Sequence, residues 1–428
     1  MAELSWFQKI GYSVGALGMS LVTYATMQWV TYLYAPTRDS TLPMLVPAIA
    51  LMGVAMAVGR IVDAVADPLV GFWSDRTRTR WGRRKPFIVF GSLPLAISFM
   101  LIWSPLRSTS SMANFFYITL VLCAFFFLFT VVICPYLALL PEIATSSEQR
   151  ISLSACQAVF NLLGLAIGLI GSSYLIGAVG FFNMGLILGI ISLISFYIPV
   201  IVIKERTELN KDDLGLPFKS AFIESFRNRP FVFYIIAMFF MLIASNILIA
   251  VVPYFTTIIL HEEASSAGIL SGVLVLVAMI FFPVVTRLSN LWGKKKVMLI
   301  SIVMLTLFLP LMATVGHTSL IPLFYQGVFC VGLIGIPLAA FFVLPYAILA
   351  DITDYDEQRT GYRREAMYFG MQGLVVKGAL GLSSLVLTTM LETFGYSTEH
   401  PLGVVLCGPV AAVFMFISLL FFWKYPLE

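Results

Sequence analysis

Long apolar runs separated by short polar segments dominate this chain. A membrane-spanning helix needs about 20 mostly apolar residues, and on that rule the pattern predicts twelve spanning helices. They are expected near residues 11–35, 42–72, 85–105, 112–139, 151–177, 181–203, 230–259, 267–290, 296–316, 320–349, 366–394 and 401–424. A basic, polar segment divides six spans from six. We therefore predict an all-α membrane protein with an N-terminal six-helix bundle (1–203), a cytoplasmic central loop (204–230) and a C-terminal six-helix bundle (231–428).

Composition supports this class. The chain of 428 residues is 60% hydrophobic and 11% charged, whereas a soluble globular protein carries about 25% charged residues. The first residues lack the basic cluster and the small-residue cleavage site of a cleavable leader. The first apolar helix is therefore expected to remain in the mature protein. The five cysteines fall in apolar runs without metal-ligand spacing, and we interpret them as helix-packing residues.

Basic residues are concentrated in the loops on one side of the predicted membrane. The loops after the second, eighth and tenth predicted spans and the central segment hold most of the lysines and arginines, whereas the alternate loops hold only Arg38 and Arg107. Cytoplasmic loops of membrane proteins carry an excess of Lys and Arg. This distribution predicts a multi-pass protein of the cytoplasmic (inner) membrane, with both termini and the even-numbered connections in the cytoplasm.

The two halves repeat each other. The stretch that starts at Pro135-Tyr136 returns at Pro345-Tyr346, and Trp81-Gly82-Arg83-Arg84-Lys85 returns as Trp292-Gly293-Lys294-Lys295-Lys296. Each offset is close to half the chain. A duplicated six-helix unit in parallel orientation is the plan of the major facilitator transporters. Duplication argues against a receptor, and the lack of a soluble domain or of a phosphate-binding loop motif argues against an enzyme or an ATP-driven pump. No cofactor other than a coupling ion and no nucleic-acid partner is expected.

Three ionisable residues, Arg60, Asp63 and Asp67, lie inside the second predicted span. Such residues are costly in a bilayer and normally face a cavity or a partner. Their spacing places both carboxylates on one helical face. Two close acids favour sharing a cation, either a proton or Na⁺, so Asp63 and Asp67 are the candidate cation ligands. The alternative is a structural ion pair between Arg60 and one carboxylate. Thr130 is a candidate hydroxyl ligand, unless it bonds its own helix backbone.

Lys377 lies deep in the eleventh predicted span. A buried ammonium needs a counter-charge, which Asp63, Asp67 or an anionic group of the substrate could supply; the alternative is a lysine that extends to the membrane surface. Polar residues elsewhere in the spans line the transport cavity or, equally, form interhelical hydrogen bonds. These are Gln157, Asn161, Asn246 and Gln372.

Charged residues near the cytoplasmic ends are candidates for ion pairs that close an inner gate. The alternative is solvated loop charge. The candidates are Asp75, Arg76, Arg83 and Arg84 after the second span, and Asp351 and Arg359 after the tenth.

These motifs resemble a known family. Asp63-Ala-Val-Ala-Asp67-Pro68-Leu-Val-Gly71, the arginine-rich loop after it and Val-Val-Lys377-Gly resemble the glycoside–pentoside–hexuronide:cation symporters of the major facilitator superfamily. Melibiose permease is a familiar member, and the animal lysophospholipid symporters form a distant branch. The resemblance runs the full length. It implies that Asp63 and Asp67 bind the coupling Na⁺, Li⁺ or H⁺, with Thr130 as a further ligand and Lys377 beside the site.

The chain departs from the family pattern in two respects. Ala66 stands where the family's Na⁺ site has an Asn, so one oxygen ligand is lost and H⁺ becomes a strong rival to Na⁺. The family's galactoside-binding residues align with apolar or small residues, namely Ser20, Ile133, Leu137 and Ala158. A sugar site needs several polar groups to hold hydroxyls, so the predicted cavity is less polar and galactosides are disfavoured.

The sequence thus predicts a symporter, functional as a monomer, that moves a small-molecule substrate together with H⁺ or Na⁺ by alternating access. The family favours a sugar or glycoside as cargo. A lysophospholipid or another amphiphile is the alternative cargo, for which Lys377 would meet the phosphate. A non-transporting membrane scaffold is the alternative of another class, but a scaffold gains nothing from Asp63, Asp67 and Lys377 inside the membrane.

Overall fold

The computed structural model describes residues 4–144, 146–203, 227–361 and 365–427, and their regular structure is helical apart from one isolated bridge between Thr79 and Gly82. The chain divides into two compact units. Unit 1 comprises Met1–Lys211 with Ala264–Gly268, and unit 2 comprises Asp212–Glu263 with Ile269–Glu428. Most of the predicted central loop lies outside the described residues.

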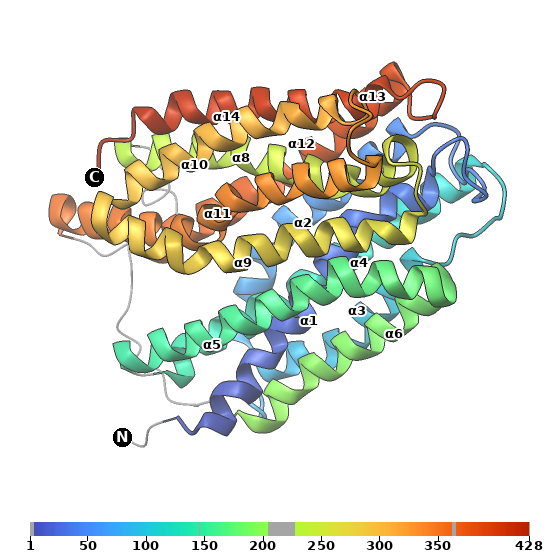
Figure 1. The fold of residues 1–428 in the computed structure, drawn as a ribbon. Coiled ribbons are helices and arrows are strands. Elements are labelled where there is room, and N and C mark those ends of the chain that lie inside the picture. Colours follow the sequence, from blue (N-terminus) through green and yellow to red (C-terminus); the bar gives the residue numbers. More distant parts are fainter. Residues whose placement is uncertain (1–3, 145, 204–226, 362–364, 428) are drawn as a thin grey trace. The chain divides into compact units, whose positions relative to one another are not determined.

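The helices of unit 1 follow one another along the chain from α1 to α6 (Figure 1). α1 packs against α5 and α6, α2 packs against α4, and α3 packs against α4 and α6. The π-helical turn η1 joins α5 to α6, and Gly180 breaks α6 with a φ of 79°. Such a φ favours glycine because it has no Cβ. The bounds are α1 Trp6–Tyr34, α2 Ala50–Arg76, α3 Lys85–Ile102, α4 Met112–Ile143, α5 Ser147–Ala166, η1 Ile167–Gly171 and α6 Ser172–Val202.

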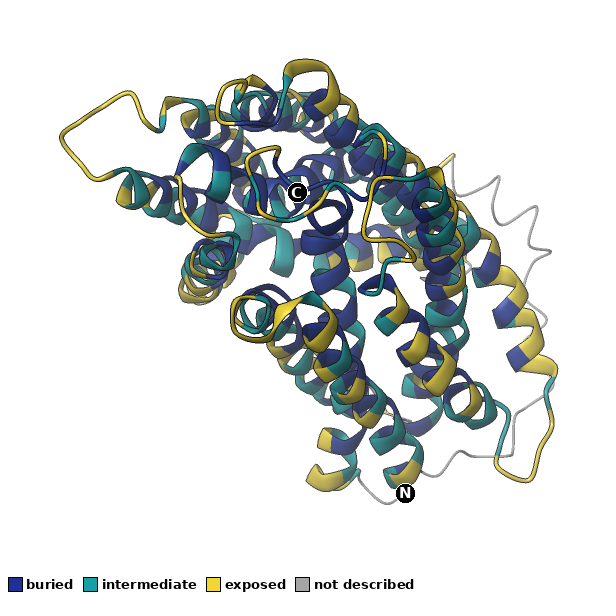
Figure 2. Ribbon diagram, turned by 90° about the vertical axis from the view of Figure 1, so that its right-hand side faces the viewer, coloured by how far each residue is buried: buried dark blue, intermediate teal, exposed yellow. Residues whose placement is uncertain are grey.

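The later helices are α8 Arg229–Tyr254, η2 Phe255–Ile259, η3 Ala264–Ser266, α9 Ala267–Trp292, α10 Lys294–Phe308, η4 Leu309–Thr314, α11 Leu323–Thr360, α12 Glu365–Phe394, α13 Leu402–Val405 and α14 Cys407–Trp423. Within unit 2, α8 packs against α12 and α14, and α10 packs against α11 and α14. Figure 2 shows buried residues along the helices of the chain, whereas many of the loops that join helices are exposed.

Nine stretches among the described residues are long and apolar enough to cross a membrane. The nine do not include α1 or α2, and they count α5, η1 and α6 as the single stretch Glu148–Val202. α2 contains Arg60, Asp63 and Asp67, which lower its mean hydropathy. The total of twelve spans therefore stays a prediction.

Two predicted boundaries are wrong. Residues 42–49 precede α2 and are not part of it, because Pro43 and Pro47 lack an amide hydrogen and disfavour helical backbone in the residue before them. The second wrong boundary is the end of the tenth predicted span. α11 continues through the predicted loop to Thr360, so Asp351 and Arg359 are helical. Gly361, in the left-handed conformation, ends it and donates to the carbonyl of Glu357.

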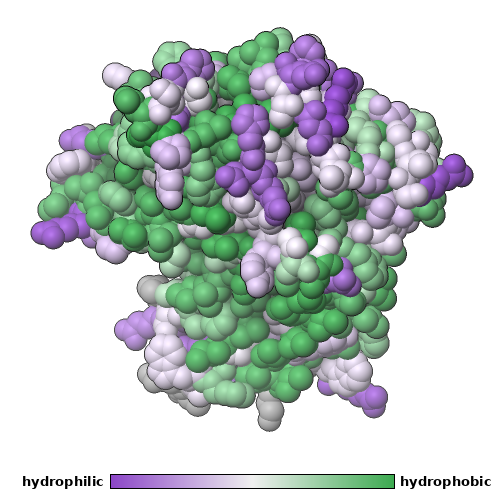
Figure 3. All heavy atoms as spheres, turned by 45° about the vertical axis from the view of Figure 1, so that its right-hand side comes forward, coloured by the Kyte–Doolittle hydropathy of each residue, from purple (hydrophilic) through white to green (hydrophobic). Residues whose placement is uncertain are grey.

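The outward surface of the units is largely apolar. Large side chains such as Ile61, Leu120 and Phe329 are exposed, and Figure 3 shows hydrophobic residues over much of the face that it draws, with hydrophilic residues in smaller groups. Exposed apolar area of this extent is unusual for a soluble monomer. It suits helices whose outer faces contact lipid tails.

Candidate functional site

The close packing of α2 on α4 positions the candidate cation site. Gly59 of α2 faces the ring of Phe126 on α4, where an added Cβ would lie 2.7 Å from the Phe126 Cδ2 atom. No real side chain tolerates that approach, so the glycine permits the contact. One turn further along each helix, Asp63 and Thr130 meet.

Asp63 has both carboxylate oxygens engaged. The Thr130 hydroxyl donates to Oδ1 over 2.7 Å, and the Arg60 guanidinium lies 3.2 Å from Oδ2. Asp63 is 1% exposed and Arg60 6%. The guanidinium carbon also lies 4.1 Å from the centroid of the Phe126 ring, a cation–π distance. The structure thus brings together Arg60, Asp63 and Thr130, and both the ion pair weighed from the sequence and the Thr130 contact are present.

Asp67 lies one turn further along α2 and is half-buried. One arginine and two acids leave this helix face with one net negative charge when all three are ionised. Pro68 follows directly and has no amide hydrogen, so the helical hydrogen bond to the carbonyl of Ala64 cannot form. The carbonyl oxygen of Ala64, which lies between the two aspartates in sequence, therefore lacks the amide donor that a regular helix would supply.

Among the described residues, no group of three or more His, Cys, Asp and Glu side chains is arranged to hold a metal ion. A Na⁺ ion at the two aspartates would therefore depend on neutral oxygens as well. The Thr130 hydroxyl and the Ala64 carbonyl are the oxygens at hand.

Lys377 and Gln372 lie on α12 of unit 2. Lys377 is half-buried near the middle of the helix. Gln372 is buried, and its Oε1 atom has no hydrogen-bond partner. The pairing of Lys377 with an aspartate of α2 remains a prediction.

Some polar atoms of the other predicted cavity residues form hydrogen bonds between helices, and others have no hydrogen-bond partner. Asn161 accepts a hydrogen bond of 2.7 Å from Ser20 between α5 and α1, and the Asn246 amide donates to Ser383 between α8 and α12. These two contacts are interhelical hydrogen bonds, the alternative to lining a transport cavity. However, Asn246 Oδ1 and the Nε2 atom of buried Gln157 lack partners, which is unfavourable for a buried polar group.

Most of the predicted gate residues form ion pairs within their own unit. In unit 1, Arg84 pairs with Asp75 at 2.5 Å and donates to Ser74. The Nε atoms of Arg83 and Arg84 lie 3.1 Å and 3.2 Å from Oε1 of Glu142. Sequence reasoning missed Glu142 as the shared partner.

The internal repeat contained the signal for that pairing. In the register that aligns Trp81 with Trp292, Arg83 corresponds to Lys294. Lys294 lies 2.7 Å from Asp351 in unit 2, and Asp351 follows its Pro-Tyr pair at nearly the same spacing as Glu142 follows the first one. The same ion pair is therefore built twice.

Two gate candidates have other contacts. Arg76 stacks on Phe72 of its own helix, with 3.7 Å between the guanidinium carbon and the ring centroid. Arg359 lies 3.5 Å from Asp356 and donates to the carbonyl of Arg227. Arg359 thus pairs with an acid of its own helix, whereas Asp351 pairs with Lys294 of α10.

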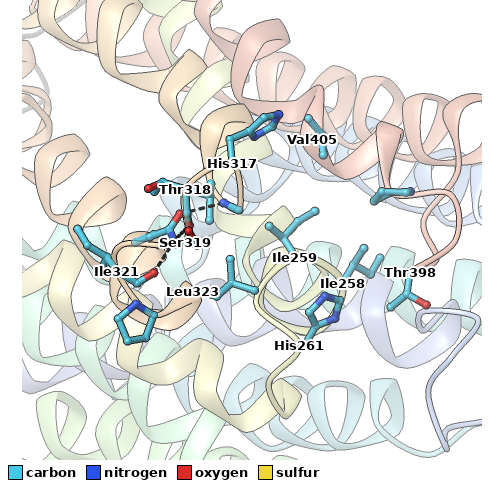
Figure 4. A pocket seen from close by; sticks show the side chains of 15 residues that line it. Ile258, Ile259, His261, His317, Thr318, Ser319, Ile321, Leu323, Thr398 and Val405 are labelled. Atoms are coloured by element: carbon cyan, nitrogen blue, oxygen red, sulfur yellow. Dashed lines mark hydrogen bonds between the residues drawn. The ribbon is translucent and has the colours of Figure 1, made fainter.

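Unit 2 also contains an open pocket of about 590 Å³ formed by the loops that follow η2, η4 and α12 (Figure 4). His261, His317, Thr318 and Thr398 supply polar groups among aliphatic side chains. None of the predicted cation, substrate or gate residues lines it. The pocket is therefore separate from the candidate site.

The chain is similar to known transporters along almost its whole length. The family model described as MFS/sugar transport protein matches residues 11–428. The symporter YnaJ of Bacillus subtilis is 26% identical over 97% of this chain and 90% of its own length. The isoprimeverose transporter of Lactiplantibacillus pentosus is 24% identical over 92% and 82%. The sodium-dependent lysophosphatidylcholine symporter 1 of Mus musculus is 26% identical over 100% and 86%.

Solved structures share the fold. The crystal structure of a D-xylose–proton symporter aligns with a TM-score of 0.72 at 12% identity, covering 99% of this chain and 98% of that chain. The relatives and structural neighbours are transporters, not enzymes. With a family match over almost its whole length and relatives among glycoside-type cation symporters, this chain belongs to the MFS/sugar transport protein family of multi-pass membrane transporters.

Proposed function

We propose that this transporter couples cargo movement to a monovalent cation, H⁺ or Na⁺, bound at Asp67 beside the Arg60–Asp63 pair. The supporting observation is the charge balance on α2. Arg60 pairs with Asp63, and Asp67 is a second, half-buried acid one turn further along the same helix, so α2 carries two acids and one base over residues 60–67. A bound cation of charge +1 would make this cluster neutral, which lowers the free energy of moving it through a low-dielectric interior.

The neighbouring oxygens suit either ion. For Na⁺, the carboxylates of Asp67 and Asp63, the Thr130 hydroxyl and the Ala64 carbonyl form a set of hard oxygen ligands. Backbone carbonyls released at breaks in helices serve the same purpose in other transporters. The Ala64 carbonyl would thus replace the oxygen lost at Ala66. For H⁺, Asp67 alone would carry the proton.

Transport would follow alternating access of twelve spans, with both termini in the cytoplasm and one chain as the working unit. Coupling requires that the cation binds one conformation better than the other. The duplicated ion pairs Arg83–Glu142 and Lys294–Asp351 join helix ends within each unit. We propose that they keep the cytoplasmic ends of the two bundles rigid while the bundles move.

The buried amides favour a sugar or glycoside as cargo. In unit 2, Asn246 and Gln372 belong to α8 and α12, which pack together, and each has an unpartnered oxygen. Hydroxyl groups of a sugar would satisfy these acceptors, whereas an alkyl chain would leave them unsatisfied. The relative that carries isoprimeverose points the same way.

A lysophospholipid is the second candidate cargo, which the mouse relative and Lys377 as a phosphate partner support. A scaffold without transport activity would have no use for the buried charges of α2.

Uptake into proteoliposomes tests the proposal. Purified protein is assayed with isoprimeverose, D-xylose and lysophosphatidylcholine under an imposed Na⁺ gradient, an imposed proton gradient or neither. We expect uptake of a sugar with one gradient only, and its loss in Asp67→Asn, with the exposed Arg287→Gln as the matched control. Uptake of the lysolipid alone would select the second cargo. Gradient-independent uptake that survives Asp67→Asn would refute the coupling site.

A further inference from the structure

The connection from α2 to α3 carries more positive charge than its ion pairs use. Residues 76–85 hold six basic side chains. Arg83 and Arg84 are paired with Glu142 and Asp75. Three others are exposed, and among the described residues no carboxylate pairs with them. These are Arg76, Arg78 and Arg80, which we call the arginine turn.

The arginine turn has a defined shape. The Thr79 hydroxyl donates to the carbonyl of Gly82 over 2.6 Å and accepts from the amide of Trp81 over 3.2 Å. Gly82 adopts a φ of 105°, which is open to glycine and strained for other residues. Arg84 ties the following residues back to α2 through Ser74. The arginines are therefore presented on a fixed turn.

Exposed aromatic rings surround the arginine turn. Phe72 is 51% exposed and carries the Arg76 guanidinium on its face. Trp81 is 48% exposed and stacks on exposed Phe90 with 6.0 Å between the ring centroids. Amphipathic tryptophan rings gather at the membrane–water boundary. This combination of exposed rings and guanidinium groups suits the headgroup region of a membrane, where rings can meet the tails and guanidinium groups the phosphates.

The internal repeat shows that the fold does not require this charge. In the register that aligns Trp81 with Trp292, Arg76 corresponds to Arg287, but Arg78 and Arg80 correspond to Ser289 and Leu291. The second copy connects α9 to α10 through Gly293 without either arginine. Unit 1 therefore carries two arginines that its duplicate does without.

From these observations we infer that the arginine turn binds the phosphate groups of anionic phospholipids. Guanidinium groups form strong, often paired hydrogen bonds with phosphate oxygens, and a membrane-spanning chain meets such phosphates at the depth that the rings define. By the predicted topology this is the cytoplasmic leaflet, where anionic lipids attract basic segments next to the membrane. The site is separate from the cation site and does not depend on transport.

Brominated lipids test the inference, because bromine quenches tryptophan fluorescence on contact. The full chain is placed in bicelles of phosphatidylcholine with an equal fraction of brominated phosphatidylglycerol or brominated phosphatidylcholine. The signal of Trp81 is the difference between the protein and its Trp81→Phe variant. Each basic residue next to an anionic surface contributes about fivefold in affinity. We therefore expect Arg78→Gln/Arg80→Gln to lower the preference for phosphatidylglycerol by about 10- to 30-fold.

The matched control is Arg287→Gln/Lys296→Gln, which removes two exposed charges from the repeated position in unit 2. The control should keep the preference at Trp81. Equal quenching by the two lipids in the unchanged protein would overturn the inference. So would a preference that survives Arg78→Gln/Arg80→Gln, or one that the control lowers equally, since either result would assign the effect to general surface charge.

Discussion

Removing Arg60 from the α2 cluster should leave Asp63 as a buried charge without its counter-ion. The two groups lie 3.2 Å apart and are nearly inaccessible to solvent. Breaking such a pair by truncating one partner costs about 3–5 kcal/mol, chiefly because the remaining charge is stranded. Arg60→Gln should therefore destabilise the protein by about that amount. In Arg60→Gln/Asp63→Asn no charge is stranded, and the loss should be smaller by about 2 kcal/mol.

Reversible unfolding in mixed micelles, followed by tryptophan fluorescence as the denaturing detergent is increased, measures these differences. The double-mutant cycle over Arg60 and Asp63 should give a coupling free energy of at least about 2 kcal/mol, because Asp63→Asn alone also breaks the buried pair. The coupling ion should also stabilise Arg60→Gln more than the unchanged protein, because its positive charge then meets two carboxylates that Arg60 no longer offsets. Additivity of the two substitutions within about 0.5 kcal/mol would refute the ion-pair account.

Four further changes test neighbouring claims. Pro68→Ala restores an amide donor to the Ala64 carbonyl, and should weaken Na⁺ binding severalfold by thermal shift; an unchanged affinity would exclude that carbonyl as a ligand. Thr130→Val should lower stability by about 1.5–3 kcal/mol in detergent unfolding, whereas Thr130→Ser should not. Glu142→Gln should lower it by about 2–3 kcal/mol, because two guanidinium groups lose their shared carboxylate; a neutral result would contradict the pairing. Burial raises the pKa of Tyr425 above its ordinary value of 10.0. Ionisation is thus disfavoured in the folded state, so stability should fall as pH rises above 10, and less so in Tyr425→Phe.

The helical organisation was largely predictable because long apolar runs have few other structures available in a membrane. The errors came from local backbone chemistry. Hydropathy extended the second span into residues 42–49, although Pro43 and Pro47 forbid regular helix there. It also ended the tenth span at the first charges, although the helix continues to Gly361, because charged residues are compatible with helix outside the bilayer.

The candidate site, too, was predictable from the sequence only in part. Spacing alone placed Arg60 and Asp63 on one face of α2, and the structure adds the ion pair and the Thr130 contact from another helix. Which of two acids an arginine neutralises depends on packing against α4, and sequence spacing cannot supply that. Glu142 was missed because a carboxylate at the end of an apolar helix looks like ordinary end charge until the repeat pairs it with Arg83.

Charge displacement on a solid-supported membrane tests the coupling site most directly, because it needs no knowledge of the cargo. Proteoliposomes are exposed to a step in Na⁺ concentration or in pH while the current is recorded. A cation that binds at Asp67 should produce a transient displacement that saturates with one of the two ions, vanishes in Asp67→Asn and persists in Arg287→Gln. A displacement of unchanged size in Asp67→Asn, or none with either ion in the unchanged protein, would contradict the account.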